Sequence, residues 1–117
     1  HGIEELKILN RTTKNAAKLV SALEDKGGFD QACVVTSHDG SDVDIVINAT
    51  SMGLQKSDPL PLPLDRVGDN TVIAEIIMKP EQTAWLANAE RQGLATQYGC
   101  HMLDCQVELI GKFMGAL

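Results

Sequence analysis

Short apolar runs, separated by polar turns, predict five β-strands along the chain. Each run has four to seven residues, is rich in Val, Ile, Leu or Ala, and is too short for a helix. The run at 44–48 has a β-branched centre, which is typical of a strand buried on both faces of a sheet. The predicted strands are residues 6–9, 32–36, 44–48, 71–77 and 94–98.

Three longer stretches have apolar residues at helical spacing. The first begins at Thr12 or Thr13, and Gly27–Gly28 is expected to stop it. The second covers 81–92 and is stopped by Gly93, and the third runs from 101 or 102 to about 114. Their apolar positions are 16, 17, 19, 20 and 23 in the first helix, and the stripes 103-107-110-114 and 102-106-109-113 in the third.

Strands alternate with helices or crossovers along the whole chain. Pro59, Pro61 and Pro63 keep the crossover after the run at 44–48 extended, because proline cannot continue a helix. Such alternation is typical of parallel strands joined by crossovers. The sequence therefore predicts an α/β fold with a doubly wound, mostly parallel sheet, in a single domain over residues 1–117.

Composition narrows the classes of partner. The net charge of −6 argues against nucleic acid, because phosphate binding relies on clustered Lys and Arg. No apolar segment reaches the ~18 residues of a membrane span. The three cysteines lack C-x-x-C spacing and fit reduced thiols in the cytoplasm, without a metal site. His1–Gly2 looks like a cut end, so we expect a piece of a longer chain.

The first candidate site is Asn10-Arg11-Thr12, at the carboxyl end of the strand predicted at 6–9. A dinucleotide-binding fold selective for NAD places an acidic residue at such a position, to accept the ribose 2′-hydroxyl. Here the side chains are donors, with Lys14 two residues further on, and donors suit the 2′-phosphate of NADP. The alternative is an exposed Arg after a strand end, and the triplet alone does not separate the two.

The second candidate is the loop from Asn48 to Gly53, after the strand predicted at 44–48. Its backbone and hydroxyl groups could line a cofactor, and Gly53 would permit close approach. Taken alone, the stretch fits better a plain junction in which Asn48 and Ser51 satisfy local backbone groups.

The third candidate is Gln106, which lies on the stripe formed by Met102, Leu109 and Phe113. A buried amide needs partners, and in a cleft a substrate hydroxyl could supply one. A core Gln bonded to backbone explains the position slightly better when it is taken alone.

Four motifs, in order, resemble the shikimate dehydrogenase family. They are Asn-Arg-Thr at 10–12, Asn-Ala-Thr-Ser-x-Gly at 48–53, Asp-Pro-Leu-Pro at 58–61 with a following Pro, and Gly-x-x-Met-Leu-x-x-Gln at 99–106. The resemblance covers nearly all of the chain. It implies the cofactor-binding half of a shikimate dehydrogenase or of a shikimate dehydrogenase-like paralogue, with a Rossmann-like sheet.

The resemblance also implies roles for particular residues. The residues expected to contact NADP are Asn10, Arg11, Thr12, Lys14, Asn48, Ala49, Thr50, Ser51, Met52, Gly99 and Met102. Gln106 would reach the substrate, a small cyclic hydroxy acid. The catalytic Lys and Asp of the family belong to an amino-terminal domain that this sequence does not contain, so no catalytic residue is expected here.

Departures from the family pattern favour a paralogue, whose substrate the sequence does not identify, over the enzyme of aromatic amino acid biosynthesis. The family usually has Asp-x-x-Tyr where this chain has Glu75-Ile-Ile-Met78, and Asp-Gly-Leu-Gly-Met where it has Tyr98-Gly-Cys-His-Met102. The first strand of the fold and its glycine-rich loop are absent. Because that strand lies centrally, we expect the isolated chain to be inactive, to bind NADP weakly or not at all, and to self-associate.

The expected function is therefore NADP binding within an oxidoreductase of the shikimate dehydrogenase kind. Such an enzyme reduces 3-dehydroshikimate to shikimate, or a related cyclic hydroxy acid, reversibly with NADPH. One alternative is a quinate or shikimate dehydrogenase paralogue that uses NAD. The other is a non-catalytic, dehydrogenase-like module that senses the ligand.

Overall fold

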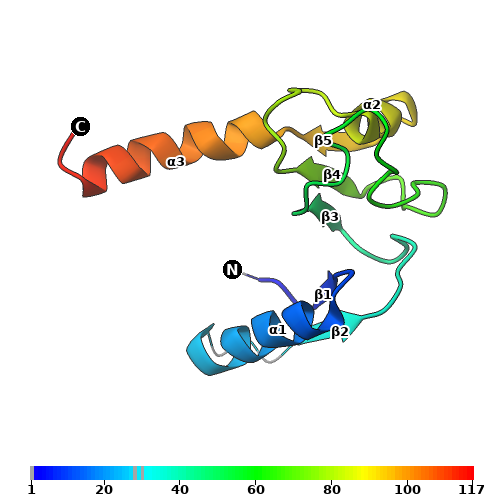
Figure 1. The fold of residues 1–117 in the computed structure, drawn as a ribbon, viewed down its shortest axis with the longest axis horizontal. Coiled ribbons are helices and arrows are strands. Elements are labelled where there is room, and N and C mark those ends of the chain that lie inside the picture. Colours follow the sequence, from blue (N-terminus) through cyan, green and yellow to red (C-terminus); the bar gives the residue numbers. More distant parts are fainter. Residues whose placement is uncertain (1, 28, 30) are drawn as a thin grey trace. The chain divides into compact units, whose positions relative to one another are not determined.

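The computed structural model describes residues 2–27, 29 and 31–117, and their contacts form two compact units. One unit reaches to His38 and the other runs from Asp39 to Leu117. Both are α/β, with parallel strands and helices (Figure 1). No described helix is long and apolar enough to cross a membrane. Whether residues 1–117 form a single domain stays a prediction.

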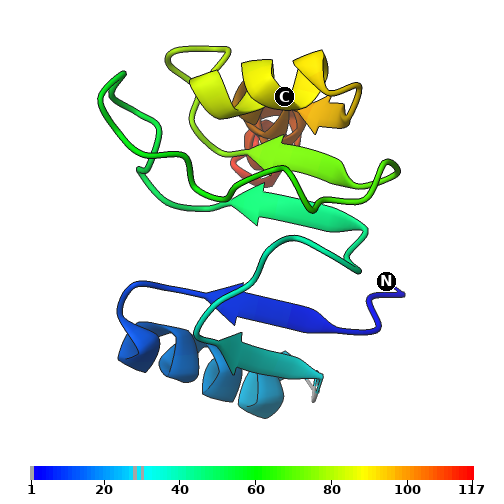
Figure 2. The ribbon, with the colours of Figure 1, turned by 90° about the vertical axis from the view of Figure 1, so that its right-hand side faces the viewer.

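The first unit is a strand–helix–strand element. Strands β1 (Leu6–Leu9) and β2 (Ala32–Val35) pair in parallel, with Leu6 opposite Ala32, and α1 (Thr13–Gly27) connects them. Figure 2 shows α1 lying along one face of this strand pair. Both strands and the helix were predicted. The predicted helix stop includes Gly28 and the predicted cut end includes His1, and both residues lie outside the described ones.

The second unit contains a three-stranded parallel sheet in the order β3-β4-β5. Its elements are β3 (Ile45–Asn48), β4 (Val72–Glu75), α2 (Ala84–Arg91), β5 (Ala95–Gln97) and α3 (Gly99–Phe113). The arrows of β3 and β4 run side by side in the same direction in Figure 2. In the part of the chain that the structure describes, β2 is the only strand that pairs with β1, and β4 is the only strand that pairs with β3. Each therefore keeps one edge without a described strand partner.

The hydrophobic core of the second unit forms around α2. Trp85 and Leu86 are fully buried against Ile73 of β4. Burying a side chain of this size contributes about 1.5–3 kcal/mol. The Trp85 Nε1–H donates to the Leu62 carbonyl over 2.8 Å, so the proline-containing crossover is fixed onto the core. The extended crossover was predicted from its prolines, and this contact shows what holds it in place.

The prediction that the strand at 44–48 is buried on both faces was wrong. Val46 packs against the core, but Ile45 and Ile47 on the other face are 56% and 57% exposed. Side chains alternate between the faces of a strand, and within this unit only one face of β3 is covered. A β-branched run thus indicated a strand correctly but overstated its burial.

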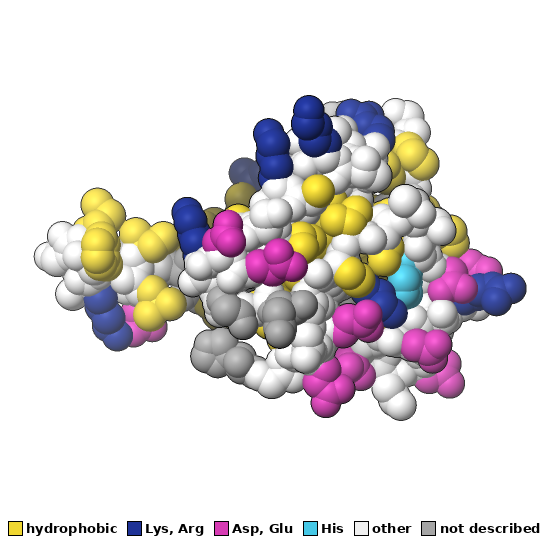
Figure 3. All heavy atoms as spheres, turned by 90° about the horizontal axis from the view of Figure 1, so that it is seen from below, with side chains coloured by type: hydrophobic (Ala, Val, Ile, Leu, Met, Phe, Trp, Pro, Cys, Tyr) yellow, Lys and Arg dark blue, Asp and Glu magenta, His cyan; other side chains and the backbone are white. Residues whose placement is uncertain are grey.

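Helix α3 also differs from its prediction. It begins at Gly99 rather than at 101 or 102, and Gly99 is its only buried residue among those described. Leu109 and Phe113, which were expected on a packed stripe, are 68% and 93% exposed. Figure 1 shows the helix leading away from the sheet of its unit, and its far end carries exposed hydrophobic side chains at the left of Figure 3. The amphipathic pattern predicted the helix, while its apolar face has no described partner.

Candidate functional site

The loop after β3 is held by the side chain of Asn48. This residue is 4% exposed, and both the nitrogen and the oxygen of its side-chain amide form hydrogen bonds with the loop. The Nδ2 group donates to the Met52 carbonyl over 2.8 Å, and Oδ1 accepts from the backbone N–H and the hydroxyl of Thr50 over 3.1 and 2.7 Å. One buried amide therefore closes the turn from residue 48 to residue 52.

Further hydrogen bonds order the rest of the loop. The Met52 N–H donates to the Thr50 hydroxyl over 3.0 Å. The N–H groups of Gly53 and Gln55 both donate to Asp58 Oδ2, over 3.2 and 2.9 Å. Gly53 has φ +96°, a conformation that L side chains rarely adopt. Asn48 thus satisfies a local backbone N–H, as the plain-junction interpretation expected, but the second side chain that does so is Thr50 and not the expected Ser51. Ala49, Thr50, Ser51 and Met52 are exposed.

Glu75, the last residue of β4, lies opposite Asn48 in the parallel register and is fully buried. Its carboxylate accepts from Asn48 Nδ2 over 2.9 and 3.2 Å and from the N–H of Ile76 over 3.0 Å. The Thr83 hydroxyl, at the amino end of α2, donates to it over 3.3 Å. The sequence interpretation missed Glu75 as a partner of the loop. The available signal was two polar residues, Asn48 and Glu75, near the carboxyl ends of neighbouring predicted strands.

Gly99 lies where α3 meets the end of β4. A Cβ atom at this position would be 2.5 Å from the carbonyl oxygen of Ile77 and 2.8 Å from that of Ile76. A side chain at Gly99 would therefore force the helix or this backbone segment to shift. Met102, three residues along α3, is 40% exposed. These two predicted site residues sit beyond the carboxyl ends of β4 and β5.

Tyr98, which precedes α3, points its hydroxyl at α2. The hydroxyl donates to Glu90 Oε1 over 2.6 Å, and Thr96 donates to the same oxygen over 3.0 Å. These bonds hold the pKa of Glu90 below its usual 4.5, with the larger effect from Tyr98. Donation to the carboxylate in turn raises the pKa of Tyr98 above 10.0. This exposed cluster braces β5 against α2.

The predicted residues Asn10, Arg11, Thr12 and Lys14 lie in the first unit. Asn10 Oδ1 accepts from the Thr12 N–H over 2.8 Å, which closes a turn just before α1. Arg11 and Lys14 are exposed. The triplet thus follows the carboxyl end of β1, as predicted, and leaves the Arg11 guanidinium open to solvent.

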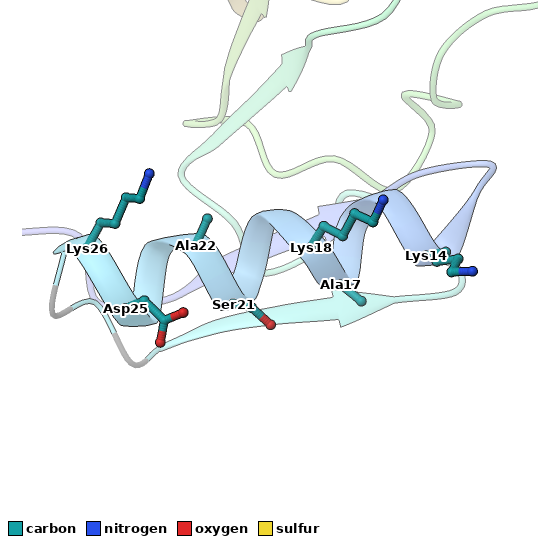
Figure 4. Close-up of a pocket in the computed structure, with 7 residues that line it drawn as sticks. All are labelled: Lys14, Ala17, Lys18, Ser21, Ala22, Asp25 and Lys26. Carbon is teal, nitrogen blue, oxygen red and sulfur yellow. The ribbon is translucent and has the colours of Figure 1, made fainter.

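An open groove runs along α1, and all of its lining residues belong to that helix (Figure 4). Lys14 is the only predicted site residue among them. The lining residues are Lys14, Ala17, Lys18, Ser21, Ala22, Asp25 and Lys26. Because a single helix forms it, the groove is a shallow depression of the helix surface, and it does not bring the predicted site residues together.

Gln106 was expected to be a buried amide, and it is exposed on α3. Gly99, against the backbone of Ile76 and Ile77, is the buried residue of α3, and the stripe that includes Gln106 is exposed. The core interpretation of Gln106 therefore does not hold in this structure. Among the described residues, no group of three or more His, Cys, Asp or Glu side chains is placed to hold a metal ion.

The chain resembles several known proteins. It is 32% identical over 107 residues to shikimate dehydrogenase (NADP(+)) of Methanosphaera stadtmanae, a match that covers 86% of this chain and 38% of that protein. No protein-family model matches the chain. The chain thus spans about 38% of the length of this curated relative.

Two solved structures share the fold. Shikimate 5-dehydrogenase from Listeria monocytogenes, in complex with shikimate and NAD, is 27% identical with a TM-score of 0.74, over 87% of this chain and 39% of that one. Quinate dehydrogenase from Corynebacterium glutamicum, in complex with NAD, has a TM-score of 0.78 at 22% identity, over 88% of this chain and 38% of that one. Its likeness establishes the fold alone.

Proposed function

This chain is homologous to part of the shikimate dehydrogenases, and from that premise we propose that it is the NADP-binding part of an oxidoreductase of that kind. One observation carries the proposal. An ordered loop of exposed residues, Ala49 to Met52, follows the carboxyl end of a parallel strand and is fixed by hydrogen bonds of the buried Asn48 side chain. Open α/β sheets bind their ligands at this edge.

The bound nicotinamide would supply the hydride chemistry, exchanging hydride with a ring carbonyl or hydroxyl of a cyclic hydroxy acid. The chain's own residues would bind and orient the nucleotide and the substrate. The small, exposed side chains of Ala49, Thr50 and Ser51 would let the backbone of the loop after β3 approach the nucleotide. Gly99 with Met102 would lie at the nicotinamide end. Gln106 would meet the substrate, and the catalytic groups would come from sequence outside these 117 residues.

The preference for NADP is proposed on the chemistry of the turn after β1. Arg11 is exposed, and Asn10 already uses its Oδ1 to close the turn. A guanidinium at this position would form a charge-assisted, bidentate contact with a 2′-phosphate. The second candidate is an enzyme that uses NAD. The Listeria monocytogenes relative, whose solved complex contains NAD, favours it.

The test is to measure the affinities of the full-length protein for NADP and NAD by calorimetry, with Arg11→Ala as the variant. A charge-assisted contact contributes roughly 1.5–3 kcal/mol, so the preference for NADP should fall about tenfold to a hundredfold. Arg91→Ala, which removes an exposed guanidinium on α2, is the matched control and should leave the preference unchanged. Equal affinities for the two nucleotides before and after Arg11→Ala would favour the NAD-dependent candidate.

A further inference from the structure

We propose that Glu75 is a positioning residue, which sets the conformation of the β3 loop (residues 48–53) for the bound nucleotide. The inference rests on the proposed function for its ligand and on the hydrogen bonds around Glu75 for its physical basis. A fully buried carboxylate is expensive unless its oxygens are satisfied. What satisfies Glu75 therefore shows what the residue does.

The described partners of Glu75 are all neutral donors. Oε1 accepts from Asn48 Nδ2 over 2.9 Å and from the N–H groups of Ile76 and Ile77 over 3.0 and 3.3 Å. Oε2 accepts from Asn48 Nδ2 over 3.2 Å and from the Thr83 hydroxyl over 3.3 Å. One side chain thus connects the end of β3, the backbone after β4 and the first residue before α2.

The decisive contact is the one with Asn48. An Asn amide can present either its oxygen or its NH₂ group to a neighbour, but in every described hydrogen bond the Glu75 carboxylate is the acceptor. Glu75 therefore draws the NH₂ group of Asn48 toward itself. The Asn48 Oδ1 is then turned toward Thr50, where it accepts the backbone N–H and the hydroxyl.

The same amide orientation fixes the far side of the loop. The NH₂ group of Asn48 donates to two acceptors, the Glu75 carboxylate and the Met52 carbonyl, and it has two hydrogens with which to do so. If the amide turned over, its oxygen would face the carboxylate and the Met52 carbonyl, and both contacts would become repulsive. Glu75 thus selects one arrangement of the loop whose exposed residues are proposed to line the nucleotide.

The test compares Glu75→Gln with Glu108→Gln, which changes an exposed glutamate of α3 in the same unit. Glu75→Gln keeps the length of the side chain but replaces one acceptor by a donor facing Asn48. The first measurement is backbone amide hydrogen exchange in the full-length protein without nucleotide, read at Thr50, Met52 and Ile73. We expect exchange at Thr50 and Met52 to rise roughly tenfold in Glu75→Gln, with Ile73 unchanged.

A purely structural role would instead raise exchange at Ile73, in the core of the unit, as much as in the loop. That result, or loop exchange equal to wild type, would overturn the inference. Glu75→Asp is the second variant, because it remains an acceptor-only group. It should lie closer to wild type than Glu75→Gln does, and the opposite order would also contradict the inference.

The second measurement is the nucleotide dependence of the full-length protein. Glu75→Gln should raise the KM for the nucleotide roughly tenfold, with kcat at saturating nucleotide within about twofold of wild type, while Glu108→Gln changes neither. An unchanged KM would overturn the inference alone. Absence of nucleotide binding by the wild-type protein would overturn the proposed function, and loop exchange would then still decide whether Glu75 fixes the loop.

Discussion

Replacing Gly99 by Ala tests how tightly α3 is seated on the end of β4. The added Cβ would lie 2.5 Å from the Ile77 carbonyl oxygen, 2.7 Å from the Ile76 carbonyl carbon and 2.8 Å from the Ile76 oxygen. Favourable separation of heavy atoms is about 3.5–4.0 Å, so α3 or the segment after β4 must move by roughly 1 Å. Both neighbours are backbone, which cannot turn aside as a flexible side chain can.

We expect this overpacking to lower the free energy of unfolding by about 1–3 kcal/mol. Gly99 is the first residue of α3, so the better helix propensity of Ala offsets at most ~1 kcal/mol of that loss. With a urea dependence of about 1–3 kcal/mol per molar, the unfolding midpoint should fall by on the order of 0.5–1 M.

The assay is urea unfolding followed by tryptophan fluorescence, because Trp85 is the only tryptophan and is fully buried in this unit. Gly68→Ala is the control, since its Cβ would meet only the Thr71 hydroxyl at 3.4 Å, an ordinary contact. Its midpoint should stay near that of wild type. If Gly99→Ala unfolds at the same urea concentration as wild type, the close approach of α3 to Ile76 and Ile77 is not a constraint on this position.

Two further predictions concern Tyr98 and Gln106. Because the pKa of Glu90 is lowered, the stabilisation from its hydroxyl partners is present above pH 4.5 and is lost as the pH falls through the lowered value. Tyr98→Phe removes one of these partners, so the free energy of unfolding of this variant should fall less steeply below pH 4.5 than that of wild type. An unchanged dependence of stability on pH would contradict this. In the full-length protein, Gln106→Ala should raise the KM for the hydroxy acid with little change in nucleotide affinity, and steady-state kinetics showing the reverse would remove Gln106 from the substrate site.

Local patterns in the sequence predicted most of the elements. All five strands and all three helices of the described chain were located, because short β-branched runs, helical periodicity and glycine or proline boundaries are local signals. Burial was predicted less well. Ile45, Ile47 and Phe113 are exposed because burial depends on which elements cover a face, and the sequence of that face does not contain this information.

In the candidate site too, the local segment was predicted and the contacts that fix it were not. The motif at 48–53 located the loop, but the side chain that fixes it, Glu75, lies 27 residues further along the chain than Asn48. Gly99 was selected as a cofactor contact, and the motif did not reveal the close backbone of Ile76 and Ile77, which also requires a residue without a side chain there. Contacts of this kind follow from strand register and packing, which a motif does not encode.

The most direct test of the central claim is to titrate isotope-labelled full-length protein with NADP and to follow the backbone amide resonances. If the β3 loop lines the nucleotide, the amides of Ala49, Thr50 and Met52 should shift and saturate with the same dissociation constant as calorimetry gives. Saturable binding that leaves those three amides unmoved, and shifts instead the residues of the groove along α1, would contradict the claim.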